Sequence, residues 1–482
     1  MFKLRDPSID LINDGKFRIV DPGPLHAPIC GFSIARDIDF SLTLETEASA
    51  DAKSTSVEHP SGTVRLNTEK VELVNDAGIK AVMSGVQPHS YIITDYFGPG
   101  VRKETSRVHL LTVETAAATA PAYTIEWLQN VPSKPFVWPD LLETLTEPGA
   151  GNGIEFSEKG LRLFDQEGRQ GFSRNSARVT IAGHHLCACS LDRPDDEAKN
   201  RPGIIVYAGI PDDLTRKKIR TALGFALGSY LVETGHTIYD HDWRIVSASV
   251  RSAYSLGQRA FDLFTLPLAH LSDHNWLHEL GRQKLTRLLN ALVEKYDDLD
   301  LGNLSWNYWH ARTATVHIAP AHYGAAIEAL QRSYMKLNPD KVPTTILSRA
   351  EWTTLRSAIG NTIMAASATE EQKRLLGGKV DSLNARPQRE LLASVLRELD
   401  IDLGVDEDAA WRRRNSAAHG SPITSGKEVS AIRDMRLLEG LFHRMLLRAA
   451  DAADAYIDYA SPGHPIRPLK QPPENVVTAA GR

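Results

Sequence analysis

Residues 16 to 210 alternate between apolar and polar side chains in short runs that turn residues interrupt. The runs GFSIARDIDFSLTLETEA (31–48) and RPGIIVYAGI (201–210) show this pattern. Side chains of a strand point alternately to its two faces, so a two-residue period predicts strands with one buried face. Because these runs are rich in Val, Ile, Thr and Tyr and bounded by turn residues, they predict an antiparallel sandwich or barrel-like domain.

The period of the apolar positions changes after residue 210. In PDDLTRKKIRTALGFALGSYLVETG, Pro211 and Asp212 form a helix start signal, and Ile219, Leu223 and Leu227 recur at helical spacing. Most of the chain beyond this segment keeps the helical period. The clearest further helices are expected at 273–298, 321–338, 387–400 and 428–460.

Proline-rich breaks suggest how the chain is divided. KLNPDKVPTT, at 336–345, has two prolines and no period, which indicates a boundary or hinge. The last residues carry five prolines and few large apolar side chains, as is typical of an unpacked extension. We therefore expect an α+β multidomain chain with a β-rich, sandwich-like sensor or regulatory domain (1–210), a transition helix and helical linker region (211–340), a helical domain (341–460) and a flexible tail (461–482).

Composition narrows the function only slightly. Of the 482 residues, 42% are hydrophobic and 24% charged, and the formal net charge is -5. Bulk charge therefore does not indicate nucleic-acid binding, and any RNA contact must be a local basic patch. Three cysteines, an odd count, argue for a reducing compartment. Without a signal-peptide-like or membrane-spanning apolar run, we expect a cytoplasmic protein with no membrane partner.

The stretch DAAWRRRNSAAHG places Arg412, Arg413 and Arg414 directly before Asn415 and His419. At roughly 100° per helical residue, Asn415 and His419 share a face, whereas Arg414 lies about 140° from His419. Arg414 and His419 can still meet on one substrate if the helix ends at His419, or if two copies of the segment face each other across a dimer. A Gly followed closely by Pro after the His favours such an end.

These residue types suit metal-free cleavage of an RNA phosphodiester. A His can take a proton from a 2′-hydroxyl or give one to a leaving 5′-oxygen. An Arg fork can hold the phosphate and stabilise the extra charge of the transition state. The same spacing is also typical of a charged helix end, because basic residues in the last turn complement the helix dipole. Spacing alone leaves both interpretations open.

The string RNSAAHG resembles the signature of HEPN domains, helical ribonuclease and toxin modules marked by Arg, four to six residues, and His. The helix expected from 427 to 459 is similar to the long C-terminal helix of such modules. A β-rich N-terminal region, the transition LGFALGSYLVETG and a helical end also resemble the layout of ApeA-like antiphage proteins. The resemblance covers about 340 to 460 and extends to the rest only in outline.

The resemblance implies a C-terminal HEPN bundle in which Arg414, Asn415 and His419 are catalytic, with Arg412 and Arg413 as substrate-binding residues. It implies a metal-independent endoribonuclease that acts on RNA without a cofactor and leaves a 2′,3′-cyclic phosphate, with tRNA as the expected target. It further implies a homodimer formed through the HEPN domain, a role in abortive infection and a phage-derived protein as trigger. The alternative is a non-catalytic helical dimerisation or interaction protein with a ligand-binding β domain.

A second group of chemically active side chains stands in GHHLCAC. On a strand, His185, Cys187 and Cys189 share one face next to His184, and such soft ligands suit Zn²⁺. Structural zinc sites draw on wider loops or a second ligand pair, and no CxxC partner occurs elsewhere. We therefore expect buried or edge-strand thiols and no metal.

Overall fold

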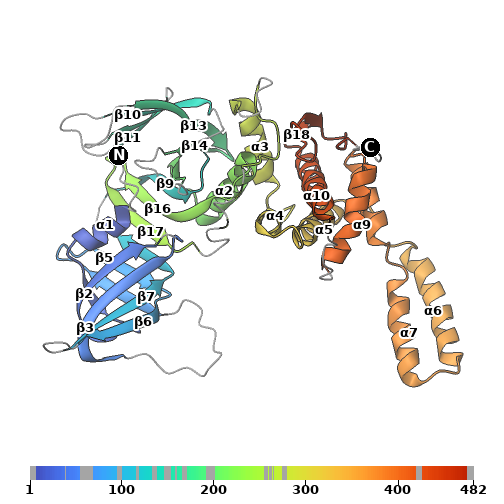
Figure 1. The fold of residues 1–482 in the computed structure, drawn as a ribbon, viewed down its shortest axis with the longest axis horizontal. Helices are drawn as coiled ribbons and strands as arrows, with labels where there is room; N and C mark the ends of the chain where they lie inside the picture. Colours follow the sequence, from blue (N-terminus) through green and yellow to red (C-terminus); the bar gives the residue numbers. More distant parts are fainter. Residues whose placement is uncertain are drawn as a thin grey trace. The chain divides into compact units, whose positions relative to one another are not determined.

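The computed structural model divides the chain into two units, each described here by itself (Figure 1). Unit 1 is Met1–Pro267 with Leu271–Val293, and unit 2 is Leu268–His270 with Glu294–Arg482. The first half of the chain is rich in strands and the second half in helices, so the α+β multidomain prediction is confirmed. The described residues are 7–37, 39–54, 69–94, 100–115, 119–132, 138–145, 153–157, 160–164, 171–191, 201–253, 259, 263, 265–273, 279–418 and 426–474.

The larger sheet of unit 1 has 13 strands within the described residues. Its neighbours pair antiparallel, except for β10 and β12, which run parallel. In spatial order its strands are β1 (Arg18–Asp21), β4 (Lys70–Val74), β5 (Lys80–Ser84), β8 (Leu110–Glu114), β17 (Ile245–Arg251), β16 (Val232–Asp240), β9 (Pro121–Gln129), β15 (Gly203–Ala208), β14 (His184–Ser190), β13 (Gly171–Ile181), β10 (Asp140–Leu145), β12 (Gly160–Phe164) and β11 (Gly153–Ser157).

A smaller sheet packs against one end of the larger one. One apolar core takes Leu44 from the smaller sheet, Leu73 and Val113 from the larger sheet and Ile12 from helix α1. Alternating side chains from two sheets thus meet in one core, as in a sandwich. The smaller sheet has the order β2 (His26–Arg36), β3 (Leu42–Ser54), β7 (Val101–Val108) and β6 (Gln87–Thr94), and α1 is Pro7–Asp14.

Helix α2 (Asp213–Leu227) begins where the sequence predicts it. The Asp212 side chain accepts a hydrogen bond from Thr215 N and caps the helix. Gly228 ends the helix with a φ of 63°, and a Cβ there would lie 2.0 Å from the backbone carbon of Leu266. Only glycine avoids both the strain and the collision. Helix α3 (Arg282–Glu294) is shorter than the expected helix at 273–298.

In unit 2, α5 contacts α4, α8, α9 and α10, and α9 also contacts α10. Helices α6 and α7 lie side by side as a separate hairpin (Figure 1). No α6 residue is buried, whereas α10 buries more than half of its length. The helices are α4 (Leu301–Thr313), α5 (Ala319–Leu337), α6 (Arg349–Ala365), α7 (Glu370–Ser382), α8 (Gln388–Glu398), α9 (Val405–Ala418) and α10 (Glu428–Ala449).

The end of unit 2 differs from the expectation in two ways. Helix α10 stops at Ala449, not near residue 459, because Asp451 takes a φ of 52° and the chain then enters β18 (Ala455–Ile457). Strand β18 pairs with β19 (Ile466–Pro468), which lies in the segment expected to be an unpacked tail. Arg467 and Leu469 are 8% and 1% exposed, so this part of the segment packs on the unit, although most of its other side chains are exposed.

Candidate functional site

Helix α9 carries the arginine motif and is anchored at its first turn. Asp406, Glu407 and Asp408 stand there, where acidic side chains favour the positive end of the helix dipole. The Glu407 carboxylate accepts a hydrogen bond from Gly404 N at 2.9 Å. It also accepts 2.8 and 2.9 Å bonds from Nη1 of Arg444 on α10, whose side chain is fully buried. This contact fixes the start of α9 on α10.

Arg444 has every donor in use. Its Nε donates to Leu469 O at 2.8 Å, and its Nη2 donates to Asp402 O and Lys470 O at 2.7 Å each. With the two bonds to Glu407, all five N–H groups of the guanidinium have an acceptor. A buried charge is tolerated only under such conditions, so this pair is a structural anchor.

Arg414, the first residue of the RNSAAH motif, is held on the α5 side of α9. Its guanidinium carbon lies 3.3 Å from the ring centroid of Trp411, and Nη1 donates to Trp411 O at 2.9 Å. Its Nη2 forms an ion pair with Glu328 of α5. The side chain is 9% exposed. Gly324 of α5 makes room, since a Cβ there would lie 2.6 Å from the Arg414 Cδ.

Arg413 pairs with a carboxylate of α10. Its Nε and Nη2 donate to the two Asp434 oxygens of α10 at 2.6 Å each, which is a bidentate fork. The Asp434 hydrogen bond raises the pKa of Arg413. Since the Arg413 side chain is 58% exposed, this pair is open to solvent on the arginine side.

Arg412 shares one carboxylate oxygen with Arg389 of α8. Nε of Arg412 donates to Asp408 Oδ2 at 3.1 Å, and Nη2 of Arg389 donates to the same atom at 3.0 Å. The hydrogen bond from Arg412, with the charges of both arginines, lowers the pKa of Asp408. The side chains of Arg389 and Arg412 are 62% and 61% exposed. Two positive groups thus meet one negative group at an accessible surface.

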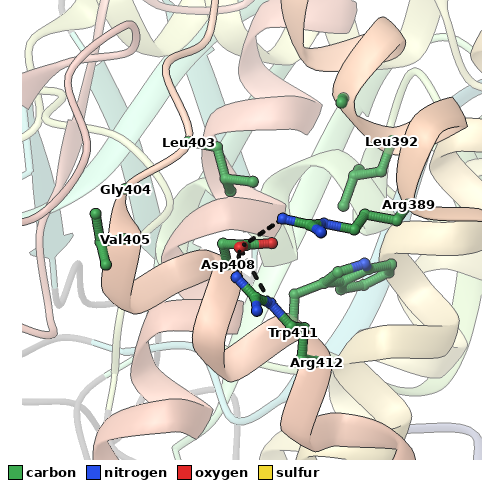
Figure 2. A pocket seen from close by; sticks show the side chains of 9 residues that line it. Arg389, Leu392, Leu403, Gly404, Val405, Asp408, Trp411 and Arg412 are labelled. Carbon is green, nitrogen blue, oxygen red and sulfur yellow. Dashed lines mark hydrogen bonds and ion pairs between the residues drawn. The ribbon is translucent and has the colours of Figure 1, made fainter.

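A groove opens between α8 and the start of α9 beside this trio (Figure 2). It encloses about 330 Å³. Apolar side chains form much of its wall, and the Arg389–Asp408–Arg412 trio contributes the charges. The residues that line it are Arg389, Leu392, Ala393, Leu403, Gly404, Val405, Asp408, Trp411 and Arg412.

The remaining motif residues are placed only in part. Asn415 belongs to the described part of α9, although its side chain lies outside the described residues, and so does the whole of His419. The structure therefore brings Arg412, Arg413, Arg414 and the Asn415 backbone together on one helix. It does not test the pairing of Asn415 with His419.

Several partners of the motif were missed by sequence reasoning. The Asp408–Arg412 pair has an i,i+4 spacing that could have been read from the sequence. Glu328 and Asp434 lie 86 and 21 residues from their arginines, and no local pattern connects them. Their roles follow only from the packing of α5 and α10 against α9.

A second buried polar network lies along α4 and α10. Glu439 of α10, fully buried, pairs with Arg312 Nε at 3.4 Å and with Arg436 Nη1 at 2.6 Å. The Tyr308 hydroxyl lies 2.9 Å from Nε2 of His443, which is also fully buried. Burial lowers the pKa of His443 to about 4. Glu439 and His443 have no solvent access, and Arg436 is the partly exposed edge of the network, so these contacts serve packing.

The His–Cys group of unit 1 lies on β14, as the sequence predicts. Cys187 and Cys189 are fully buried in an apolar core, where burial raises the pKa of both thiols. His185 is exposed and lies 2.8 Å from the Thr180 hydroxyl through Nδ1. Within the described ranges, no cluster of three or more His, Cys, Asp or Glu side chains could hold a metal ion.

Comparison with known proteins adds no identity. No family model, no curated protein and no solved structure matches the chain. In the part of the chain that the structure describes, no helix has the length and apolarity that crossing a membrane requires. The function must therefore be argued from α9 and its surroundings.

Proposed function

We propose that this chain is a metal-independent endoribonuclease whose active site is the RNSAAH motif, residues 414–419, which begins on α9. The observation that carries the proposal is the set of three consecutive guanidiniums on one anchored helix, directly before Asn415 and His419. Each guanidinium is oriented by a carboxylate, so little ordering remains when a phosphate binds. No metal is needed, because His and Arg supply proton transfer and charge stabilisation.

In the proposed reaction, His419 accepts the proton of a ribose 2′-hydroxyl while the 2′-oxygen attacks the adjacent phosphorus. The bond to the 5′-oxygen breaks, that oxygen takes up a proton from water, His419 returns its proton to solvent, and a 2′,3′-cyclic phosphate remains. Arg414 stabilises the extra negative charge on the phosphoryl oxygens. Within the described residues, two of its five donors serve Trp411 and Glu328, and a phosphate would take the others.

The biological setting of the proposal follows the HEPN resemblance. The chain would act in the cytoplasm as an antiphage effector, with tRNA as substrate and a phage-derived protein as trigger. Two copies would join through the helical domain so that two motifs face each other. The β-rich unit would sense the trigger or restrain the ribonuclease.

One observation favours the non-catalytic alternative. Arg414 is 9% exposed and already pairs with Glu328, as a purely structural arginine would. In that case the helical unit would only dimerise or interact with a partner, and the β-rich unit would bind a ligand. The two functions differ in one measurable property, the cleavage of RNA.

The test is incubation of the purified chain with total tRNA in EDTA. Loss of the proton-transfer group in His419→Ala should lower cleavage about 10²–10⁴-fold. Arg414→Ala should lower it by a similar factor. Arg397→Ala is the control, since Arg397 is an exposed residue of the neighbouring α8 outside the groove. Products should end in a 2′,3′-cyclic phosphate.

An enzyme that needs its trigger would be inactive in the cleavage assay. Growth arrest on overexpression and on phage challenge tests the proposal in that case. Both motif variants should lose the arrest, and Arg397→Ala should keep it. The proposal fails if wild type neither cuts RNA nor arrests growth, or if the motif variants behave like wild type in both assays.

A further inference from the structure

The groove between α8 and α9 has the two chemical features that a nucleotide needs. Leu403 and Val405 give it accessible apolar surface, and Leu392 and Trp411 lie buried in its wall. Arg389 and Arg412 supply positive charge. Figure 2 shows the two guanidiniums converging on Asp408, with Leu392 and Trp411 on the same side as Arg389. An enclosed volume of about 330 Å³ is near the lower end of the range for small-molecule sites. It suits a single nucleotide.

The charge balance of the trio favours an anion. Two guanidiniums surround one carboxylate, which leaves one net positive charge at an accessible position. Arg389 uses only Nη2 and Arg412 only Nε and Nη2 for Asp408. Within the described chain, no other hydrogen bond engages either guanidinium. Nη1 of both residues is therefore available to a phosphate, which arginine forks recognise well.

The position of the groove relates it to the motif. Arg412 precedes Arg414 by two residues, which on a helix is about 3 Å along the axis and roughly 200° around it. Trp411 contacts the Arg414 guanidinium and also lines the groove. The groove therefore lies on nearly the opposite side of α9 from Arg414, and Trp411 is the residue that contacts both.

We propose that this groove is a nucleotide subsite that binds a base of the same RNA strand away from the cleaved bond, with its phosphate on Arg389 and Arg412. The inference rests on the proposed ribonuclease function and extends it by a second contact with single-stranded RNA. Unstacked bases of single strands bind to apolar surfaces and to guanidinium planes. Arg389, which no motif includes, becomes a substrate-positioning residue of α8.

The experiment uses the full chain with His419→Ala, so that bound RNA is not consumed. Fluorescent single-stranded RNA tetranucleotides, with and without an abasic position, are titrated at several salt concentrations. The variants are Arg389→Ala, Ala393→Leu to fill the groove, and Arg397→Ala as the matched control on α8. Thermal unfolding of each variant verifies the fold.

Arg389→Ala should weaken oligonucleotide binding about 10-fold, because a charge-assisted contact is lost. It should also lower the slope of log Kd against log salt by about 0.7, the value for one phosphate contact on a single strand. Ala393→Leu should weaken binding without changing the slope, since it displaces the base and not the phosphate. Arg397→Ala should change neither quantity, and one abasic position should weaken binding.

Four results would overturn the subsite: no oligonucleotide binding, equal effects of Arg389→Ala and Arg397→Ala, inorganic phosphate that competes as well as RNA, or an acidic peptide that binds with the same variant response. The ribonuclease proposal is judged separately. If wild type cuts RNA while Arg389→Ala binds normally, only the subsite fails. If the groove binds RNA as described but wild type passes neither cleavage nor growth test, only the ribonuclease proposal fails.

Discussion

Glu407 and Asp408 are neighbours on α9 and both bind arginine, yet their two sites differ in closure. Glu407 is 1% exposed and meets the fully buried Arg444, whose five donors all have acceptors. Asp408 meets Arg389 and Arg412, which are more than half exposed and keep unused donors. One helical step of about 100° separates an anchor from an open site.

The difference teaches how the same residue types serve structure or recognition. A closed pair has lost its water on both sides, so removal of one partner leaves an unpaired buried charge. An open pair exchanges its partner for water or a ligand at little loss. The contrast predicts large stability effects around Glu407 and small stability effects with binding consequences around Asp408.

The largest effect is expected for Arg444→Ala. It should lower the free energy of unfolding by about 3–5 kcal/mol, because Glu407 remains buried without its partner. Arg412→Ala, at an exposed pair, should lower it by about 0–1 kcal/mol. Urea denaturation of both variants measures the two losses in the free energy of unfolding. Equal losses would show that the two sites do not differ in closure.

A pH effect of about 2 kcal/mol between pH 7 and pH 5 is expected from His443. Burial lowers its folded pKa from 6.5 to about 4, although the charge of Glu439 opposes the shift and those of Arg312 and Arg436 add to it. The unfolded chain then binds the proton more tightly, so stability is full above pH 6.5 and is lost as the pH falls toward 4.

His443→Gln should remove this loss, which urea denaturation at pH 7 and pH 5 measures. The exposed His317→Gln is the control and should keep the wild-type dependence. The lowered pKa of Asp408 affects stability in a different pH range. Its carboxylate stabilises the fold above the unfolded pKa, and this effect is lost only below about pH 4. A pH dependence unchanged in His443→Gln would contradict the assignment.

An intermediate effect is expected for the Arg414–Glu328 pair, which is 9% and 32% exposed on its two sides. A double-mutant cycle with Arg414→Ala and Glu328→Ala should give a coupling energy of about 1 kcal/mol in the free energy of unfolding. A value of about 3 kcal/mol or more would place Arg414 with the closed anchors. It would then favour the non-catalytic alternative.

The sequence predicted those elements of the fold that local chemistry or a buried face determines. Helix α2 and its Asp212 cap were predicted because local chemistry sets them. The α6–α7 hairpin was missed, since α6 buries nothing and Leu355 and Met364 are 44% and 62% exposed. Without a buried face there is no period to read. The end of α10 was misplaced because helical spacing continues into β18, where pairing with β19 decides the structure.

The candidate site was predictable only where its contacts are local. Arg412, Arg413, Arg414 and Asn415 lie within one helix, and the Asp408–Arg412 spacing is helical. The contact between Glu407 and Arg444 spans 37 residues, and that between Glu328 and Arg414 spans 86. A sequence pattern shows that an arginine is present. It does not show which carboxylate the arginine binds. The structure was therefore needed to show that Arg412 is exposed and Arg414 is not.

Asp408→Asn should have the smallest effect on stability. It should lower stability slightly and strengthen the binding of RNA. The free energy of unfolding should fall by less than about 1 kcal/mol, because both arginines are exposed. RNA tetranucleotides should bind the His419→Ala protein about fivefold more tightly, since a negative charge near the phosphate, which opposes binding by ~1 kcal/mol, is removed. Glu398→Gln is the matched control: it removes an exposed carboxylate of α8 outside the groove and should change neither stability nor binding. Weaker binding in Asp408→Asn would mean that the carboxylate is needed to orient Arg389 and Arg412, and that the open site depends on Asp408 as the closed site depends on Glu407.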